Sequence, residues 1–160
     1  MSRLGELTAK VDAFFERVQA RHGADMQCGT GCSDCCHVRL SVTAVEANAI
    51  RTLIAGFTVD QRRALATTSS PEHCAALDAA GRCRIYAARP LVCRSHGAPI
   101  RMRIDSLPIV QSCHRNFTHT TPDADCVIDQ ETLSTLSLAV DRAEGGDGTR
   151  IDLATLLGTM

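Results

Sequence analysis

Aromatic residues are scarce in this sequence of 160 residues, which has no Trp, one Tyr and four Phe. Proteins bind single-stranded nucleic acids by stacking the bases on aromatic side chains, and small-molecule pockets are commonly lined with the same residues. The formal net charge of −1 provides no overall field that would attract DNA or an anionic lipid surface. We therefore expect neither a nucleic-acid partner nor an aromatic ligand pocket.

Long apolar runs are also lacking. No segment approaches the roughly 20 consecutive apolar residues that a membrane-spanning helix needs, so we expect no membrane association. Charged residues such as Glu6, Lys10 and Asp12 interrupt the N-terminal segment, which therefore lacks the apolar stretch of a signal peptide. The sequence predicts a cytoplasmic protein.

Cysteine, in contrast, is abundant, with nine residues in the chain. Thiols stay reduced in the cytoplasm, where a cysteine-dense chain binds metal or carries out redox chemistry more often than it forms structural disulfides. The rest of the composition, 44% hydrophobic and 22% charged, is that of a globular protein. A chain of this length suits one domain, and we expect 1–160 to form a single metal-binding domain.

Helical patterns dominate both ends of the chain. Apolar residues recur at three- and four-residue spacing from Leu4 to Val18, which predicts an amphipathic helix. Thr43 and Glu46 form a capping-box pattern that marks the start of another helix. The predicted helices cover 3–21, 44–55, 59–67, 129–142 and 151–157.

The middle of the chain is predicted to be less regular. A loop is expected over 68–73, followed by two short extended pieces over 74–86 that a turn near Gly81 joins. Three prolines limit long helices over 89–116, so irregular structure is expected there: Pro90, Pro99 and Pro108. The predicted fold class is α+β, mainly helical, with short strands and a hairpin, organised around a cysteine-ligated metal centre.

The densest cysteine motif has the spacing C-x3-C-x2-C-C and consists of Cys28, Cys32, Cys35 and Cys36. Intervals of two and three residues let several thiolates converge on one metal centre. Buried cysteines without a metal would explain one or two of these residues, but four within nine positions favour ligation. The motif therefore predicts a thiolate-bound metal centre.

Four further cysteines are widely spaced: Cys74, Cys83, Cys93 and Cys113. They would complete a second tetrahedral shell or supply missing ligands of the first. Cys35 and Cys36 are adjacent, and neighbouring side chains of an extended segment point apart, which favours two centres or one polynuclear cluster over a single ion. The division of the eight cysteines stays open. For Cys126, burial in the core and metal ligation are equally good interpretations.

A second motif runs from Gly81 to Arg94 and reads G-x-C-x-I-Y-x-x-R-P-x-x-C-R. Together with the dense loop and the sequence SVTAVE at 41–46, it resembles the YkgJ-type cysteine-cluster family, described as a zinc- or iron-chelating domain. The resemblance covers a core of about 28–115, with helical extensions on both sides. Related cysteine clusters in flagellin lysine methylases imply an iron–sulfur centre.

Basic residues accompany the cysteines. The segment 81–116 has seven Arg and a single acidic residue, Asp105. A four-thiolate site holding zinc or an oxidised cubane carries about two negative charges, which nearby cations offset. Arg89 and Arg94 are the expected contacts around the cofactor, and a solvated face or a docking surface for an acidic partner is the alternative. Three histidines near the cysteines are candidates to replace a thiolate or gate redox chemistry, but eight cysteines already fill two shells, so ligation by the histidines is the weaker interpretation: His37, His96 and His114.

The sequence predicts first a protein that holds an iron–sulfur cluster, of the [4Fe–4S] type, for redox chemistry, electron transfer or cluster handling. The alternative is a zinc-binding interaction module without catalytic activity, since tetrahedral thiolates suit both metals. An enzyme with an open metal position is a third interpretation. No catalytic residues are expected, because the sequence has no Ser–His–Asp order, phosphate loop or paired carboxylates. A protein partner is left open.

Overall fold

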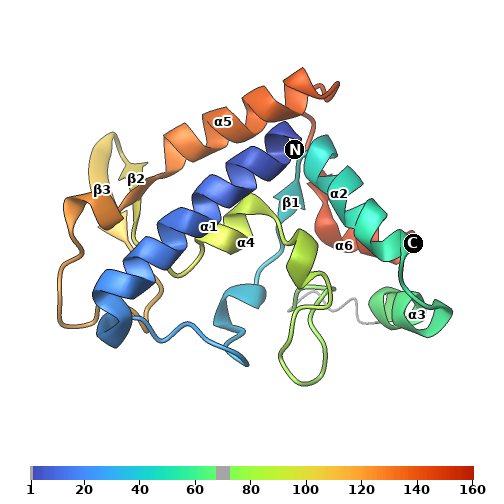
Figure 1. Ribbon diagram of the computed structural model, residues 1–160, viewed down its shortest axis with the longest axis horizontal. Coiled ribbons are helices and arrows are strands. Elements are labelled where there is room, and N and C mark those ends of the chain that lie inside the picture. The colour runs from blue at the N-terminus through green and yellow to red at the C-terminus, as the bar shows by residue number, and fades with distance from the viewer. Residues whose placement is uncertain (1, 68–72) are drawn as a thin grey trace. The chain divides into compact units, whose positions relative to one another are not determined.

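The computed structural model describes residues 2–67 and 73–160 (Figure 1). The chain divides into two compact units. Unit 1 consists of Met1–Gly29 and Leu91–Ala139, and unit 2 of Thr30–Pro90 and Val140–Met160. Apart from His73, the loop predicted over 68–73 lies outside the described residues. Among the described helices, none is both long enough and apolar enough to span a membrane.

Unit 1 is built on the helix α1, which spans Arg3–His22 and confirms the prediction for 3–21. The Ser2 hydroxyl begins it by accepting a hydrogen bond of 3.1 Å from the amide of Gly5. Short helical segments follow along the chain: η1 (Gly23–Asp25), α4 (Leu91–Ser95) and η4 (Ala124–Cys126). Helix α4 packs against α1, as Figure 1 shows.

A three-stranded sheet also belongs to unit 1, in the order β3-β2-β4. Strands β2 (Ile100–Ile104) and β3 (Leu107–Gln111) form an antiparallel hairpin, and β4 (Ile128–Asp129) pairs parallel to the start of β2. The irregular structure predicted over 89–116 is therefore wrong for this stretch. The two-residue turn at Asp105 and Ser106, both at positive φ (49° and 67°), is the type that joins strands tightly. A proline at position 108 is compatible with the sheet because β3 is an edge strand, where a missing N–H donor is tolerated.

The core of unit 1 is small and contains a cysteine. Its buried residues are Val18, Met26, Ala98 and Cys126, with Phe14, Phe15, Cys28 and Phe117 packed around them. The helix α5 (Gln130–Ala143) follows β4 and confirms the helix predicted to begin at Asp129, whose carboxylate accepts a hydrogen bond of 2.8 Å from the Thr132 amide. Its first ten residues belong to unit 1 and its last four to unit 2.

Unit 2 contains the helices α2 (Ala44–Ala55), α3 (Val59–Thr67) and α6 (Leu153–Gly158), the short segments η2 (Asp34–Cys36) and η3 (Tyr86–Ala88), and the paired strands β1 (Ser41–Val42) and β5 (Ile151–Asp152). The capping box is present at α2, since the Glu46 carboxylate accepts from the Thr43 amide at 2.9 Å and from its hydroxyl at 3.1 Å. Apolar residues of α2, α3 and α6 form the core, with Ile50, Leu65 and Leu157 almost completely buried.

The predicted turn near Gly81 is present, although the flanking residues form a single antiparallel bridge between Leu77 and Cys83 instead of two strands. Gly81 adopts φ +73°, and an added Cβ would lie 3.4 Å from the Ser33 hydroxyl oxygen. Helices outnumber the short strands, which confirms the mainly helical α+β class. Whether 1–160 folds as one cooperative domain stays a prediction.

Candidate metal centre

Four of the predicted ligands lie on neighbouring segments of unit 2, although among the described residues no three of their sulfur atoms lie within 4.8 Å of one another. Cys35 and Cys36 lie on the single turn η2, which the Cys36 amide closes by donating to the Ser33 carbonyl at 2.8 Å. The Cys74 amide donates to the Cys36 carbonyl at 2.7 Å, so two segments far apart in sequence meet at their cysteines. The bridge between Leu77 and Cys83 returns the chain toward Cys74, whose charge influences the pKa of Cys83. The four-thiol group is Cys35, Cys36, Cys74 and Cys83.

The side chains of Cys35 and Cys36 interact with each other, and this interaction is the largest cause of the opposite pKa shifts of the two thiols. The expectation that these neighbours point apart is wrong, since it assumed an extended segment and the chain forms a helical turn here. The side-chain hydrogen bond between them lowers the pKa of Cys35 to about 6, while burial opposes this shift. The same bond, followed by burial, raises the pKa of Cys36.

The thiols of Cys74 and Cys83 both have a raised pKa, so they stay protonated unless a cation is bound nearby. Burial raises the pKa of Cys74, and a negative charge on Cys35 raises it further. Burial likewise raises the pKa of Cys83, with an added contribution from a charge on Cys74. The thiols are therefore close enough for each thiolate to disfavour the next. A metal ion or cluster offsets such a charge, so the donor chemistry of this group fits thiolate-bound metal.

Arg89 supplies positive charge to this group. After the hydrogen bond and burial effects, its guanidinium is among the influences that lower the pKa of Cys35 and of Cys83. The guanidinium also lies over the Tyr86 ring, 4.3 Å from the ring centroid, which fixes its direction. Arg94, the second predicted cofactor contact, lies on α4 in unit 1 and forms an ion pair of 2.7 Å with Asp12 of α1.

A histidine pair flanks the four-thiol group. The Nδ1 atoms of His37 and His73 are 2.9 Å apart and share a hydrogen bond, with the rings nearly perpendicular at 85°. His37 follows Cys36 and His73 precedes Cys74 in the chain. His37 was identified from its position in the sequence, whereas His73 was missed because nothing in the sequence links it to His37.

Three other predicted ligands belong to unit 1. Cys93 lies on α4, Cys113 follows the end of β3, and Cys28 packs at the rim of the unit 1 core. The remaining predicted ligand, Cys32, is partly buried in the loop that leads to η2 of unit 2. The contribution of these four cysteines to a metal centre remains a prediction.

Asn116 organises the surroundings of Cys28 and was not identified from the sequence. It is 3% exposed, and its amide nitrogen donates to the Cys28 sulfur at 3.2 Å and to the Gly97 carbonyl at 2.7 Å. Its side-chain oxygen accepts from the Gln27 amide at 2.8 Å. Gly97, at φ +97°, is required because an added Cβ would lie 2.5 Å from the Cys28 sulfur. The only hint in the sequence is that Asn116 follows Cys113 by three residues.

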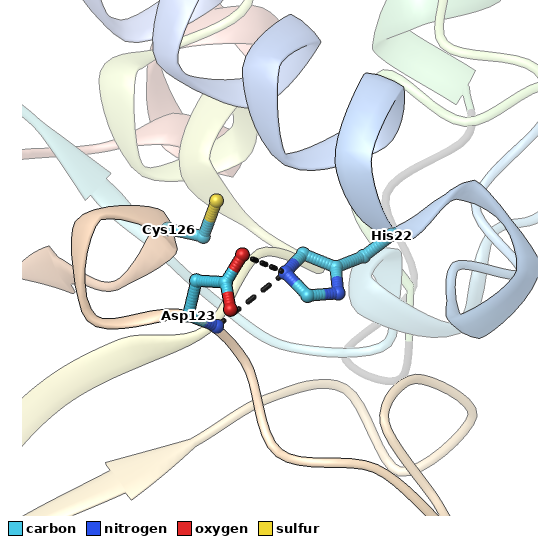
Figure 2. Close-up of side chains that lie close together, drawn as sticks. All are labelled: His22, Asp123 and Cys126. Atoms are coloured by element: carbon cyan, nitrogen blue, oxygen red, sulfur yellow. Dashed lines mark hydrogen bonds and ion pairs between the residues drawn. The ribbon is translucent and has the colours of Figure 1, made fainter.

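A second cluster of metal-type donors lies in unit 1, away from the sequence motifs. Figure 2 shows His22 at the end of α1 opposite Asp123, the residue before the turn η4, and Cys126, the last residue of that turn. One donor atom of each residue lies within 4.8 Å of the other two. The imidazole Nε2 of His22 is 3.3 Å from an Asp123 carboxylate oxygen. Neither His22 nor Asp123 was a candidate on sequence grounds.

Comparison with known proteins agrees with the cysteine pattern. No curated protein and no solved structure matches the chain. The model of the CxxCxxCC family, described as a zinc- or iron-chelating domain, matches residues 27–128. This range covers well over half of the chain and contains all eight cysteines of the predicted ligand set, which confirms the resemblance stated above. The chain belongs to the CxxCxxCC family of zinc- or iron-chelating domains.

Proposed function

We propose that this protein holds an iron–sulfur cluster of the [4Fe–4S] type through its cysteines and serves in electron transfer, redox sensing or cluster handling in the reducing cytoplasm. The proposed ligands are drawn from the eight motif cysteines: Cys28, Cys32, Cys35, Cys36, Cys74, Cys83, Cys93 and Cys113. When bound, such a cluster accepts or donates single electrons. The family supports metal chelation, and the arguments below favour iron over zinc.

The observation that carries the proposal is the placement of two adjacent thiols, Cys35 and Cys36, on one turn beside the Cys74 segment. In a polynuclear cluster each of two neighbouring thiolates can bind a different iron. The CxxxCxxC spacing of Cys28, Cys32 and Cys35, together with the adjacent fourth thiol, favours iron over zinc. The backbone hydrogen bond from the Cys74 amide to the Cys36 carbonyl brings a third cysteine next to the adjacent pair. The Cys74 thiol takes no part in that bond.

The charge around the four-thiol group is consistent with a cluster. Four thiolates with an oxidised cubane carry about two negative charges in total, and a nearby guanidinium stabilises them. Arg89 meets this requirement, since its charge favours the thiolates of Cys35 and Cys83. We propose that Arg89 holds the reduction potential up by stabilising the more negative, reduced state. For Arg94 the proposed role is positional, because its ion pair with Asp12 fixes α4, the helix that carries Cys93.

Anaerobic purification followed by visible spectroscopy and elemental analysis tests the proposal. We expect a brown protein with the broad absorption of thiolate-to-iron charge transfer, together with iron and acid-labile sulfide. Arg89→Gln should leave the iron content unchanged and lower the reduction potential, whereas the exposed Arg103→Gln should change neither. A colourless protein with stoichiometric zinc would refute the iron assignment and support the zinc-binding interaction module instead.

A further inference from the structure

The three donors His22, Asp123 and Cys126 are held by rigid local structure. Asp123 is the residue before η4 and Cys126 its last residue, and the Cys126 amide donates to the Asp123 carbonyl at 2.9 Å. This single turn therefore fixes the spacing of the carboxylate and the thiol. His22 is the last residue of the 20-residue helix α1, and its ring packs edge-on against Phe117, with centroids 5.2 Å apart.

The opposite side of the imidazole provides a second, independent observation. The Nδ1 atom of His22 lies 3.8 Å from a carboxylate oxygen of Asp25, while Nε2 faces Asp123 at 3.3 Å. Histidines that bind metals typically present their other ring nitrogen to a carboxylate, which fixes the tautomer and the ring orientation. The Asp25 carboxylate lies on that side of the ring at ion-pair distance, longer than a hydrogen bond. On the other side, Nε2 also accepts a hydrogen bond of 3.4 Å from the Asp123 amide, so the atom proposed to bind the metal is directed at the Asp123 segment.

The three side chains differ in solvent exposure, from the buried thiol to the exposed carboxylate. Cys126 is completely buried, the His22 side chain is 13% exposed and that of Asp123 is 58% exposed. A metal ion at this place would thus have protein on the sulfur side and access to solvent on the carboxylate side. Three protein ligands with one open position is the coordination typical of exchangeable or reactive zinc.

The surrounding charges permit a divalent cation. A thiolate and a carboxylate together balance the charge of a divalent ion. Arg21 is a neighbouring cation, whose guanidinium contacts both oxygens of Asp125 at 2.7 and 2.8 Å and is 3.8 Å from Asp123. Asp125 therefore holds Arg21, which leaves the carboxylate of Asp123 directed mainly at His22.

We propose that His22, Asp123 and Cys126 bind a divalent metal ion of the zinc class, separate from the motif cysteines, and that Asp25 orients His22 for this role. Nitrogen, oxygen and sulfur donors in one set suit a borderline ion such as zinc. The His22–Asp123 distance of 3.3 Å is already close to the ligand separation of about 3.4 Å that tetrahedral zinc bonds impose. The Cys126 sulfur lies within 4.8 Å of a donor atom of each of the other two residues.

Metal counting on the full-length protein tests this site. Zinc and iron are measured after anaerobic purification with zinc in the medium, in wild type and in the variants His22→Gln and Asp123→Asn. Each variant should contain one equivalent of zinc less than wild type, with iron content and visible spectrum unchanged. Two matched controls from unit 1, the exposed His119→Gln and Asp105→Asn, should retain the wild-type zinc content. Loss of iron together with zinc in His22→Gln and Asp123→Asn would point to the motif centre and overturn the proposal.

Cobalt provides the spectroscopic test. Wild type reconstituted with Co²⁺ should show a thiolate-to-cobalt charge-transfer band. In Cys126→Ala the intensity of this band should fall by the contribution of one thiolate. Asp25→Asn should weaken Co²⁺ affinity about 10- to 100-fold without removing the band. Equal metal content in wild type, His22→Gln and Asp123→Asn would overturn the proposal. If His22→Gln fails to fold, as judged by circular dichroism, the more exposed Asp123→Asn decides the outcome alone.

Discussion

The backbone amide of Cys74 donates a hydrogen bond of 2.7 Å to the carbonyl oxygen of Cys36. This bond brings the dense cysteine loop and the segment 73–90 together in unit 2 through main-chain atoms. The sulfur atoms of both residues remain available for a metal. A metal bound to both segments would therefore strengthen a connection that the backbone already makes.

The first prediction concerns the motif cysteines. Cys35→Ser and Cys74→Ser should each abolish retention of iron, because each removes one member of the four-thiol group. Cys126→Ala should leave the iron content intact, because Cys126 lies in the core of unit 1 and outside the motifs. Iron analysis and the visible spectrum of the purified variants provide the measurement. Equal loss of iron in all three variants would instead favour one site that includes Cys126.

The second prediction concerns Asn116. Replacement by Ala removes three hydrogen bonds and leaves the Gln27 amide and the Gly97 carbonyl without their partner, so the free energy of unfolding should fall by about 2–4 kcal/mol. Urea denaturation of the metal-loaded protein measures this change. The exposed Asn48 on α2 is the control, and Asn48→Ala should change stability by less than about 0.7 kcal/mol. Equal effects of the two substitutions would contradict the role of Asn116.

The third prediction separates crowding from backbone strain at Gly97. Gly97 and Gly145 have similar positive φ values of 97° and 92°, but an added Cβ contacts the Cys28 sulfur only at Gly97. Gly145→Ala should cost about 1–2 kcal/mol for the left-handed backbone alone. Gly97→Ala should cost clearly more and should displace Cys28. Thermal denaturation of both variants makes the comparison, and equal costs would show that the sulfur yields easily.

The fourth prediction links the metal to the order of unit 2. Thiolate-bound structural metal contributes about 10–16 kcal/mol of apparent binding free energy, comparable to the net stability of a whole domain. Hydrogen exchange under reducing conditions should therefore show that chelation removes protection from 73–90, where regular structure is limited to one bridge and η3. Helix α1 and the β2–β3 hairpin should keep their protection, because their backbone hydrogen bonds do not depend on cysteines. Unchanged protection in 73–90 after verified metal loss would mean that unit 2 folds without metal.

The helices of this protein were predictable because their signals are local. The apolar spacing from Leu4 to Val18 and the capping box at Thr43 identify α1 and α2 to within one residue. The β2–β3 hairpin was missed because Pro108 was interpreted as excluding regular structure. The alternating residues of IRMRI and the short Asp-Ser turn were available signals, but an edge strand, where proline is tolerated, is known only from the sheet order.

The candidate sites divide in the same way. The cysteines proposed as ligands were recognised from the sequence, four of them from the dense C-x3-C-x2-C-C motif, and the family model supports metal chelation by this domain. The approach of His22 to Cys126 joins residues more than one hundred positions apart and depends on where α1 ends relative to η4. The side-chain interaction of Cys35 with Cys36 depends on a helical turn. The glycines and serines around these cysteines gave no sign of that turn, and an extended segment was expected. Such relationships arise from the packing of the chain and have no local signature.

Pro108 has a further consequence for the hairpin. The pair flanking the two-residue turn is Ile104 and Leu107, and because hydrogen-bonded and non-bonded pairs alternate, the nitrogen of Pro108 faces the outer edge of β3. An approaching strand would find no N–H donor there, although Leu107 and Val110 are 68% and 49% exposed. Proline at this position therefore protects an exposed, apolar edge strand against edge-to-edge aggregation with other chains.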